Sequence, residues 1–207
     1  ILENGKPCAL TKEAGQCAAI LETWFNGDQG AYAIADVLFG KANPAGRLPI
    51  SIPTSLGVSP SYYSRLPGSM GGSYLETDAI NLFEFGYGLS YTRFEYSGLS
   101  IENRSQGGKI AVDVSLTVTN AGDVDGDEVI QLYVSDEVSS IVTPEKLLKA
   151  FKREFFRAGE SRTIRFTLDF DAFKLLNSDG QWVVEPGKFI LSVGASSRDI
   201  RLTGELI

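Results

Sequence analysis

The composition of this 207-residue chain is that of a folded globular protein, with 43% hydrophobic and 22% charged residues. Histidine is absent, which excludes the Ser-His-Asp triad, the Cys-His pair and the usual zinc and copper sites. The net charge of −7 argues against a nucleic-acid partner, since backbone binding needs clustered Lys and Arg. No apolar run approaches the roughly 18 residues of a membrane span, so we expect no membrane partner either.

The first fifty residues predict two helices between two short strands. Ile1-Leu2 resembles the end of a strand, and Leu48–Pro53 resembles an edge strand because its two prolines remove ladder donors. Spacing of three and four residues predicts a helix that Thr11 caps and a second helix that Asp28 caps and Gly40 ends. Their apolar stripes are Ala14, Cys17, Ala18, Leu21, Trp24 and Phe25 in the first, and Ala31, Ile34, Ala35 and Leu38 in the second.

The two cysteines leave two states open. Cys8 and Cys17 are able to form one disulfide, but Cys17 falls on the predicted apolar stripe, where a free thiol behaves as a small hydrophobic side chain. Residues 1–53 are also too few to bury both helices, because chains of roughly 40 residues seldom fold alone. We therefore expect the rest of this sheet to come from elsewhere in the same protein.

Residues 54–82 are rich in Ser, Gly, Pro and Tyr and predict a long loop. From Phe94 onward the pattern changes to short strands in which apolar and polar residues alternate. Val112 to Val118, Ile130 to Val134 and Ile164 to Phe170 are the clearest of these runs. Roughly seven strands over about 110 residues predict a two-sheet sandwich. The chain is therefore predicted to be α/β and then all-β.

Six segments of the chain resemble, in the same order, segments of three-domain enzymes of glycoside hydrolase family 3. The two most specific are Asn43-Pro44-Ala45-Gly46-Arg47-Leu48-Pro49 and Phe85-Gly86-Tyr87-Gly88-Leu89-Ser90-Tyr91-Thr92; the others are residues 24–30, 35–40, 118–122 and 182–187. The resemblance implies the end of an α/β sandwich domain in residues 1–53, a linker in residues 54–93 and a fibronectin type III-like domain in residues 94–207. It also implies that residues 83–92 fasten the sandwich to the α/β part.

By resemblance, such an enzyme hydrolyses terminal β-linked sugars with retention of configuration, which requires two carboxyl groups about 5 Å apart. In the family the nucleophile is an Asp of a barrel domain and the acid/base is a Glu of the α/β domain, both expected upstream of residue 1. Glu3, Glu13 and Glu22 are the nearest carboxylates here, and none has matching surroundings. We therefore expect no catalytic residue and no cofactor in this chain, and no hydrolase activity from it alone.

The resemblance favours a β-glucosidase, with a β-xylosidase or α-arabinofuranosidase of the same family as alternatives. A non-catalytic sandwich module that binds carbohydrate or protein is a further alternative, for which Tyr133 and Trp182 are candidate exposed aromatics. The expected partners are the N-terminal catalytic portion and a β-linked oligosaccharide or glycoside, and a homo-oligomer is left open. Secretion, a periplasmic location and a cytoplasmic location all remain open, because no leader is visible in these residues.

Tyr62, Tyr63, Arg65 and Tyr74 are the predicted substrate-binding residues of this chain. Tyr and Arg offer a stacking face together with directed donors, which suits a leaving-group subsite near the domain junction. The same residues would also serve a domain interface, and both interpretations are kept. Arg47 is predicted to donate to a carboxylate or carbonyl across that interface. The acidic run from Asp123 to Glu128 lacks EF-hand spacing, so we expect a polar turn and no metal site.

Overall fold

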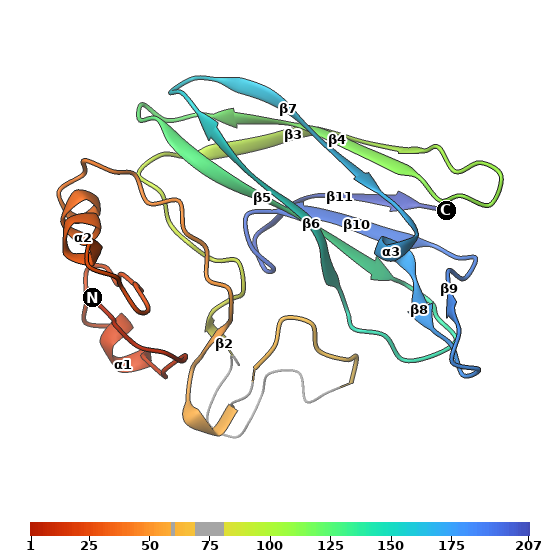
Figure 1. Ribbon diagram of the computed structural model, residues 1–207, viewed down its shortest axis with the longest axis horizontal. Coiled ribbons are helices and arrows are strands. Elements are labelled where there is room, and N and C mark those ends of the chain that lie inside the picture. The colour runs from red at the N-terminus through yellow and green to blue at the C-terminus, as the bar shows by residue number, and fades with distance from the viewer. Residues whose placement is uncertain (59–60, 69–80) are drawn as a thin grey trace.

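The computed structural model describes residues 1–58, 61–68 and 81–207. The C-terminal part is a β-sandwich, and an irregular N-terminal segment with two helices lies along one side of it (Figure 1). The predicted change from α/β to all-β is confirmed. No helix in the described ranges is long and apolar enough to cross a membrane.

Seven antiparallel strands form the two sheets of the sandwich, as the alternation predicts. The four-stranded sheet has the order β11 (Ile200–Leu206), β10 (Phe189–Gly194), β5 (Gly126–Asp136), β6 (Leu147–Phe156). The three-stranded sheet has the order β3 (Phe94–Asn103), β4 (Val112–Asn120), β7 (Ser161–Leu168). Helix α3 (Phe170–Phe173) and the short hairpin β8 (Leu175–Leu176) and β9 (Trp182–Val183) follow β7 at one end of the sandwich.

The core lies between the two sheets. Every second residue of β4 is buried, and β5 and β10 provide the facing side chains. Alternation places one set of side chains inside because successive residues of a strand point to opposite faces. The aliphatic side chains of this core that are less than 2% exposed are Val112, Val114, Leu116, Val118, Ile130, Leu132, Leu191 and Val193.

The N-terminal segment contains α1 (Thr11–Ala14), α2 (Gly30–Leu38), β1 (Ile52–Pro53), a 3₁₀ turn at Leu56–Val58 and β2 (Asn81–Phe83). The second predicted helix is confirmed as α2, and Gly40 follows its end with a φ of 74°. The predicted cap is wrong, because Gln29 is the N-cap residue and no side chain caps the helix.

The first predicted helix is wrong beyond Ala14, and its predicted Thr11 cap is wrong because Leu10 is the N-cap residue. The Leu2 N–H donates to Leu21 O at 2.9 Å and the Thr23 N–H donates to Leu2 O at 3.0 Å, so this segment pairs in parallel with Leu2. Trp24 has a φ of 53°, which a right-handed helix does not allow. A short buried strand and a helix share the same apolar pattern, and here the pairing with Leu2 decided between them.

The predicted strand over residues 48–53 shrinks to Ile52–Pro53, which pairs with β2. Leu48 instead exchanges hydrogen bonds with the turn at residues 86 and 87. Several large apolar side chains of the first 58 residues stay exposed, among them Phe25 at 83%, whereas Ile52 is buried. In this chain Phe25 and Cys17 are exposed and Trp24 is half-buried, so none of the three belongs to a core formed by these residues alone.

Candidate functional site

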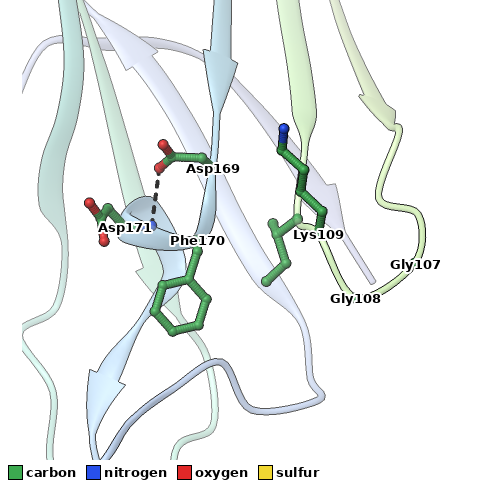
Figure 2. Close-up of a pocket in the computed structure, with 7 residues that line it drawn as sticks. Gly107, Gly108, Lys109, Asp169, Phe170 and Asp171 are labelled. Atoms are coloured by element: carbon green, nitrogen blue, oxygen red, sulfur yellow. Dashed lines mark hydrogen bonds between the residues drawn. The ribbon is translucent and has the colours of Figure 1, made fainter.

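One pocket of about 540 Å³ lies between the β3–β4 hairpin tip and α3, far along the sandwich from the N-terminal segment (Figure 2). Its two carboxylates already have structural partners. Asp169 accepts from the Asp171 N–H at 3.0 Å and so caps α3, and Asp171 pairs with Lys174 at 2.7 Å. The pocket therefore shows no pair of carboxyl groups free for acid/base chemistry.

The second candidate site is the contact between the N-terminal segment and the sandwich. We call this contact the seam, and it is formed by residues 43–48 and 84–92 where they pack against the sandwich. Two backbone hydrogen bonds hold the turn at residues 86 and 87 against Leu48. The Leu48 N–H donates to Tyr87 O and the Gly86 N–H donates to Leu48 O, both at 2.8 Å. The Phe83 and Tyr87 rings stack with centroids 5.2 Å apart. As expected for residues 83–92, this turn fastens the two parts together.

Gly86 is required by the seam for two reasons. Its φ is 80°, a left-handed value that other residues adopt only with strain, and an added Cβ would overlap the Gln131 amide, 2.8 Å from its Cδ. The Gln131 Nε2 donates to Gly86 O at 3.1 Å and to Ala195 O at 2.7 Å. The buried amide thus ties the turn to the β10–β11 loop, and only glycine allows so close an approach.

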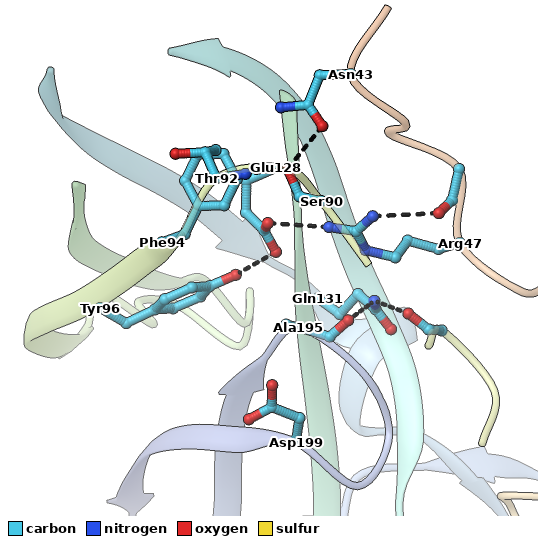
Figure 3. Close-up of polar contacts among 12 residues, drawn as sticks. Asn43, Arg47, Ser90, Thr92, Phe94, Tyr96, Glu128, Gln131, Ala195 and Asp199 are labelled. Carbon is cyan, nitrogen blue, oxygen red and sulfur yellow. Dashed lines mark hydrogen bonds and ion pairs between the residues drawn. The ribbon is translucent and has the colours of Figure 1, made fainter. Parts of the chain in front are cut away.

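Arg47 and Glu128 form a buried ion pair at the seam (Figure 3). Their closest atoms, Nη2 and Oε2, are 3.0 Å apart, and the side chains are only 8% and 3% exposed. The Tyr96 hydroxyl donates to the other carboxylate oxygen at 3.0 Å. Burial raises the pKa of Glu128 and outweighs the Arg47 guanidinium, which acts to lower it. The predicted role of Arg47 as a donor to a carboxylate across the interface is confirmed.

Asn43 makes further hydrogen bonds at the seam (Figure 3). Its Oδ1 accepts from Ser90 Oγ at 3.0 Å and from Tyr91 N at 2.8 Å, and its Nδ2 donates to Asp125 O at 3.0 Å. The Tyr91 hydroxyl donates to Val37 O at 2.6 Å. One side chain of the N-terminal segment thereby joins the residues before β3 to the turn before β5.

The structure places three of the four predicted substrate-binding residues. Tyr63 lies inside the interface, stacked on Phe85 with centroids 4.4 Å apart, and Arg65 Nε lies 3.4 Å from Glu145 Oε2. Tyr62 is 62% exposed. Tyr74 lies outside the described residues. Interface packing thus accounts for Tyr63 and Arg65, while substrate contact by the set stays a prediction.

The two candidate sugar-binding aromatics of the sandwich differ. Tyr133 is 0% exposed, so its predicted exposure is wrong: Tyr63 packs edge-on against its ring with centroids 5.8 Å apart. Trp182 is exposed, as predicted, with the Lys174 Nζ 4.8 Å from its ring centroid. Other rings of the sandwich, such as Phe151 and Phe155, are exposed on β6, and Trp182 by itself is not a sugar platform, which needs several coplanar aromatics.

The acidic side chains before and within β5 each contact a different partner. Asp125 accepts from the Ala158 N–H at 2.8 Å, Asp127 pairs with Arg153 at 3.2 Å, and Glu128 pairs with Arg47. Within the described ranges no three acidic, His or Cys side chains gather as a metal-binding group. Cys8 and Cys17 are both free thiols in the structure, the second of them exposed.

Sequence reasoning missed Glu128, Tyr96, Gln131 and Asn43. The sequence pattern could have identified Glu128. It is two residues before Ile130 and four before Leu132, so it lies on the same inward face of the strand, where a charged side chain is unusual. Such a charge needs a buried partner. Asn43 and Gln131 carry no comparable signal, because most of their partners lie in distant segments of the chain.

Comparison with known proteins assigns the two parts separately. Residues 1–91 match the glycosyl hydrolase family 3 C-terminal domain, and residues 128–197 match a fibronectin type III-like domain. A β-xylosidase of Formosa agariphila is 44% identical over 96% of this chain, and a periplasmic β-glucosidase of Salmonella typhimurium is 41% identical over 97%. The solved β-glucosidase of Listeria innocua in complex with glucose superimposes over 98% of the chain, with a TM-score of 0.91 and 35% identity.

These similarities cover nearly all of this chain and a minor part of each relative. The chain spans 28% of the length of both curated relatives and 29% of the solved chain.

Proposed function

We propose that this chain, which belongs to glycoside hydrolase family 3, forms the C-terminal portion of a retaining β-glycosidase, most specifically a β-glucosidase. The observation that carries the proposal is the continuous similarity over 97% of this chain to a β-glucosidase more than three times as long. Two relatives in different genera and a solved structure agree on the same span.

The catalytic carboxyl groups are proposed to lie upstream of residue 1, in the part of the relatives that this chain does not span. Retention needs two carboxyl groups about 5 Å apart. At the seam, Glu128 is already committed to Arg47 and Tyr96, and the pocket aspartates are committed to α3. This chain then contributes scaffold, domain interface and part of the leaving-group subsite, with the upstream portion as its partner.

The exposed apolar side chains of residues 1–58 support a partner of this kind. Phe25, Phe39 and Tyr32 are more than two-thirds exposed. Burial of apolar area stabilises by roughly 25 cal/mol per Å², so three such rings favour a covered state. The upstream portion would supply the cover if it completes the sheet that Leu2 and Leu21 begin.

A β-xylosidase is the second candidate, since the relative with 44% identity has that name. The two sugars differ by one hydroxymethyl group, and the residues that would contact it are proposed to lie upstream. Hydrolysis of nitrophenyl β-D-glucoside and nitrophenyl β-D-xyloside by the protein that includes the upstream sequence would decide between them.

The test compares this chain with that longer protein on both nitrophenyl glycosides. We expect the longer protein to release nitrophenol with retention and the 207-residue chain to release none. A Glu3→Gln, Glu13→Gln and Glu22→Gln triple variant of the longer protein should keep its activity. Release of nitrophenol by the 207-residue chain, or loss of activity in the triple variant, would place catalytic carboxylates here and overturn the proposal.

A further inference from the structure

Strand β6 forms one edge of the four-stranded sheet, and in that sheet it pairs with β5 alone. Alternate residues of an antiparallel strand direct their backbone groups to opposite sides, so an edge strand presents unpaired N–H and C=O groups along its free side. In the described ranges, residues 149–155 share backbone–backbone hydrogen bonds with β5 and with no other segment. The free side of β6 is therefore open to pairing with another strand.

The outer face of β6 carries two large exposed rings. Phe151 is 64% exposed and Phe155 is 50% exposed, and Arg153, midway between them, pairs with Asp127 of β5 at 3.2 Å. The register of β6 on β5 is regular over these residues, so the three side chains lie on one face. Burial of apolar surface is favourable, and two such rings beside an unpaired edge favour a state in which both are covered.

The opposite face of β6 carries one base and one acid at the same level. Lys152 Nζ lies 5.6 Å from the ring centroid of Phe166, and Glu154 Oε2 lies 3.1 Å from Arg162 Nη1, so both side chains are directed toward β7. A lysine on an edge strand deters pairing with most other strands. Glu154, two positions along, gives this lysine a partner of opposite charge in a copy of the same strand.

Antiparallel pairing of β6 with a second copy of itself is favoured in one register. Residues directly opposite each other share a face, so the two-fold axis passes through a residue of the strand. An axis at Arg153 puts Lys152 opposite Glu154 of the second copy, and Phe151 opposite Phe155 of the second copy. An axis one residue to either side puts Arg153 opposite one of the rings, and neither Lys152 nor Glu154 then meets an opposite charge. In the favoured register Arg153 meets its own copy, and Asp127 balances each of the two charges.

We propose that β6 is the interface of a homodimer, in which two copies of this chain pair antiparallel about Arg153 and join their four-stranded sheets. The acid–base pair and the aromatic pair each occur twice across the axis, as an isologous interface requires. A contact through one strand edge is small, so we expect a dissociation constant on the order of 10 μM. The proposal is independent of the proposed function, because it uses residues of the sandwich alone.

The test measures the dissociation constant by sedimentation equilibrium, in the protein that includes the upstream sequence. Lys152→Glu puts two acids opposite each other twice, and Glu154→Lys does the same with two bases. Like charges directly opposite are destabilising, so we expect each variant alone to raise the dissociation constant by at least about tenfold. An equimolar mixture of the two variants restores both opposite-charge pairs, so its heterodimer should form with a constant within about threefold of the wild-type value.

The mixture separates pairing from a defect of folding, because mixing two misfolded variants restores neither. Lys109→Glu is the matched control: it reverses the same charge at an exposed position between β3 and β4, and should leave the dimer unchanged. Wild-type protein that stays monomeric at roughly 100 μM would overturn the proposal, since mass action at that concentration favours the dimer. Single variants that dimerise like wild type, or a mixture that stays monomeric, would overturn it as well.

A cross-linking measurement tests the register. Directly opposite residues have Cα atoms about 4.5 to 5.5 Å apart, within the range of a disulfide. In a Cys8→Ser, Cys17→Ser background of the same protein, we expect Arg153→Cys to form a covalent dimer under mild oxidation, because the axis puts this position opposite itself. Lys149→Cys, on the same strand but away from the axis, should form none. Equal cross-linking at the two positions, or none at position 153, contradicts the proposed pairing.

Discussion

Replacing Arg47 by Met would test the physical account of the seam most directly. The substitution keeps an unbranched side chain of similar length and removes the charge that faces Glu128. It leaves a carboxylate that is 3% exposed and that still accepts a hydrogen bond from the Tyr96 hydroxyl within the sandwich. Breaking a buried ion pair by removing one partner costs about 3 to 5 kcal/mol, because the other charge stays buried without compensation.

That cost should depend on pH with a defined sign. Burial already raises the pKa of Glu128 in the folded state, and removing Arg47 would raise it further. The folded variant then binds a proton that the unfolded chain releases above about pH 4.3, so its free energy of unfolding falls as pH rises. We expect the full cost near pH 8 and a cost smaller by about 1 to 3 kcal/mol near pH 5, where protonation relieves the buried charge.

Urea denaturation followed by far-ultraviolet circular dichroism at both pH values measures this difference. Arg104→Met is the matched control, because it removes an exposed arginine paired with Glu102 at 2.9 Å and should cause no measurable change at either pH. A loss below about 1 kcal/mol for Arg47→Met, or a loss that is the same at pH 5 and pH 8, would refute the reasoning.

Gly86→Ala should destabilise the chain by about 2 to 5 kcal/mol, since it combines a left-handed backbone with overlap on Gln131. Gly159→Ala shares the left-handed φ but meets no atom within 4 Å, so it should cost only about 1 to 2 kcal/mol in the same denaturation experiment; equal losses would remove the packing argument. Asn120→Ala should cost about 2 to 4 kcal/mol, because it leaves the Gly122 N–H and Val124 O without this partner; thermal unfolding should show the loss, and a neutral result would contradict it. Leu116→Ala should cost about 2 to 5 kcal/mol by opening a cavity between the sheets, and a loss below about 1 kcal/mol would mean that the core relaxes around it.

The sandwich was predictable because its information is local. In β4 the alternation of Val114, Leu116 and Val118 with polar residues fixes which face is buried, whatever the other sheet contains. Helix α2 was predictable for the same reason, with an apolar stripe and Gly40 after its end. Because Glu128 lies on the same strand face as Ile130, the sequence pattern also indicates a buried charge there, although it does not identify Arg47 as the partner.

The seam could be decided only by the tertiary structure. Tyr133 follows the polar phase of its strand, yet it is buried, because Tyr63 from 70 residues earlier covers it. Leu21 fits a helical stripe, yet its segment is extended, because Leu2 offers the hydrogen bonds of a parallel strand.

The sequence by itself therefore determined the class of the fold, the positions of the sandwich strands and the family resemblance, each of which depends on neighbours along the chain. The tertiary structure decided which exposed-phase side chains are covered and which polar groups meet across the seam. Those outcomes depend on contacts between segments 40 to 85 residues apart, such as Ser90 with Asn43 and Leu148 with Tyr63, and a local pattern carries no record of them.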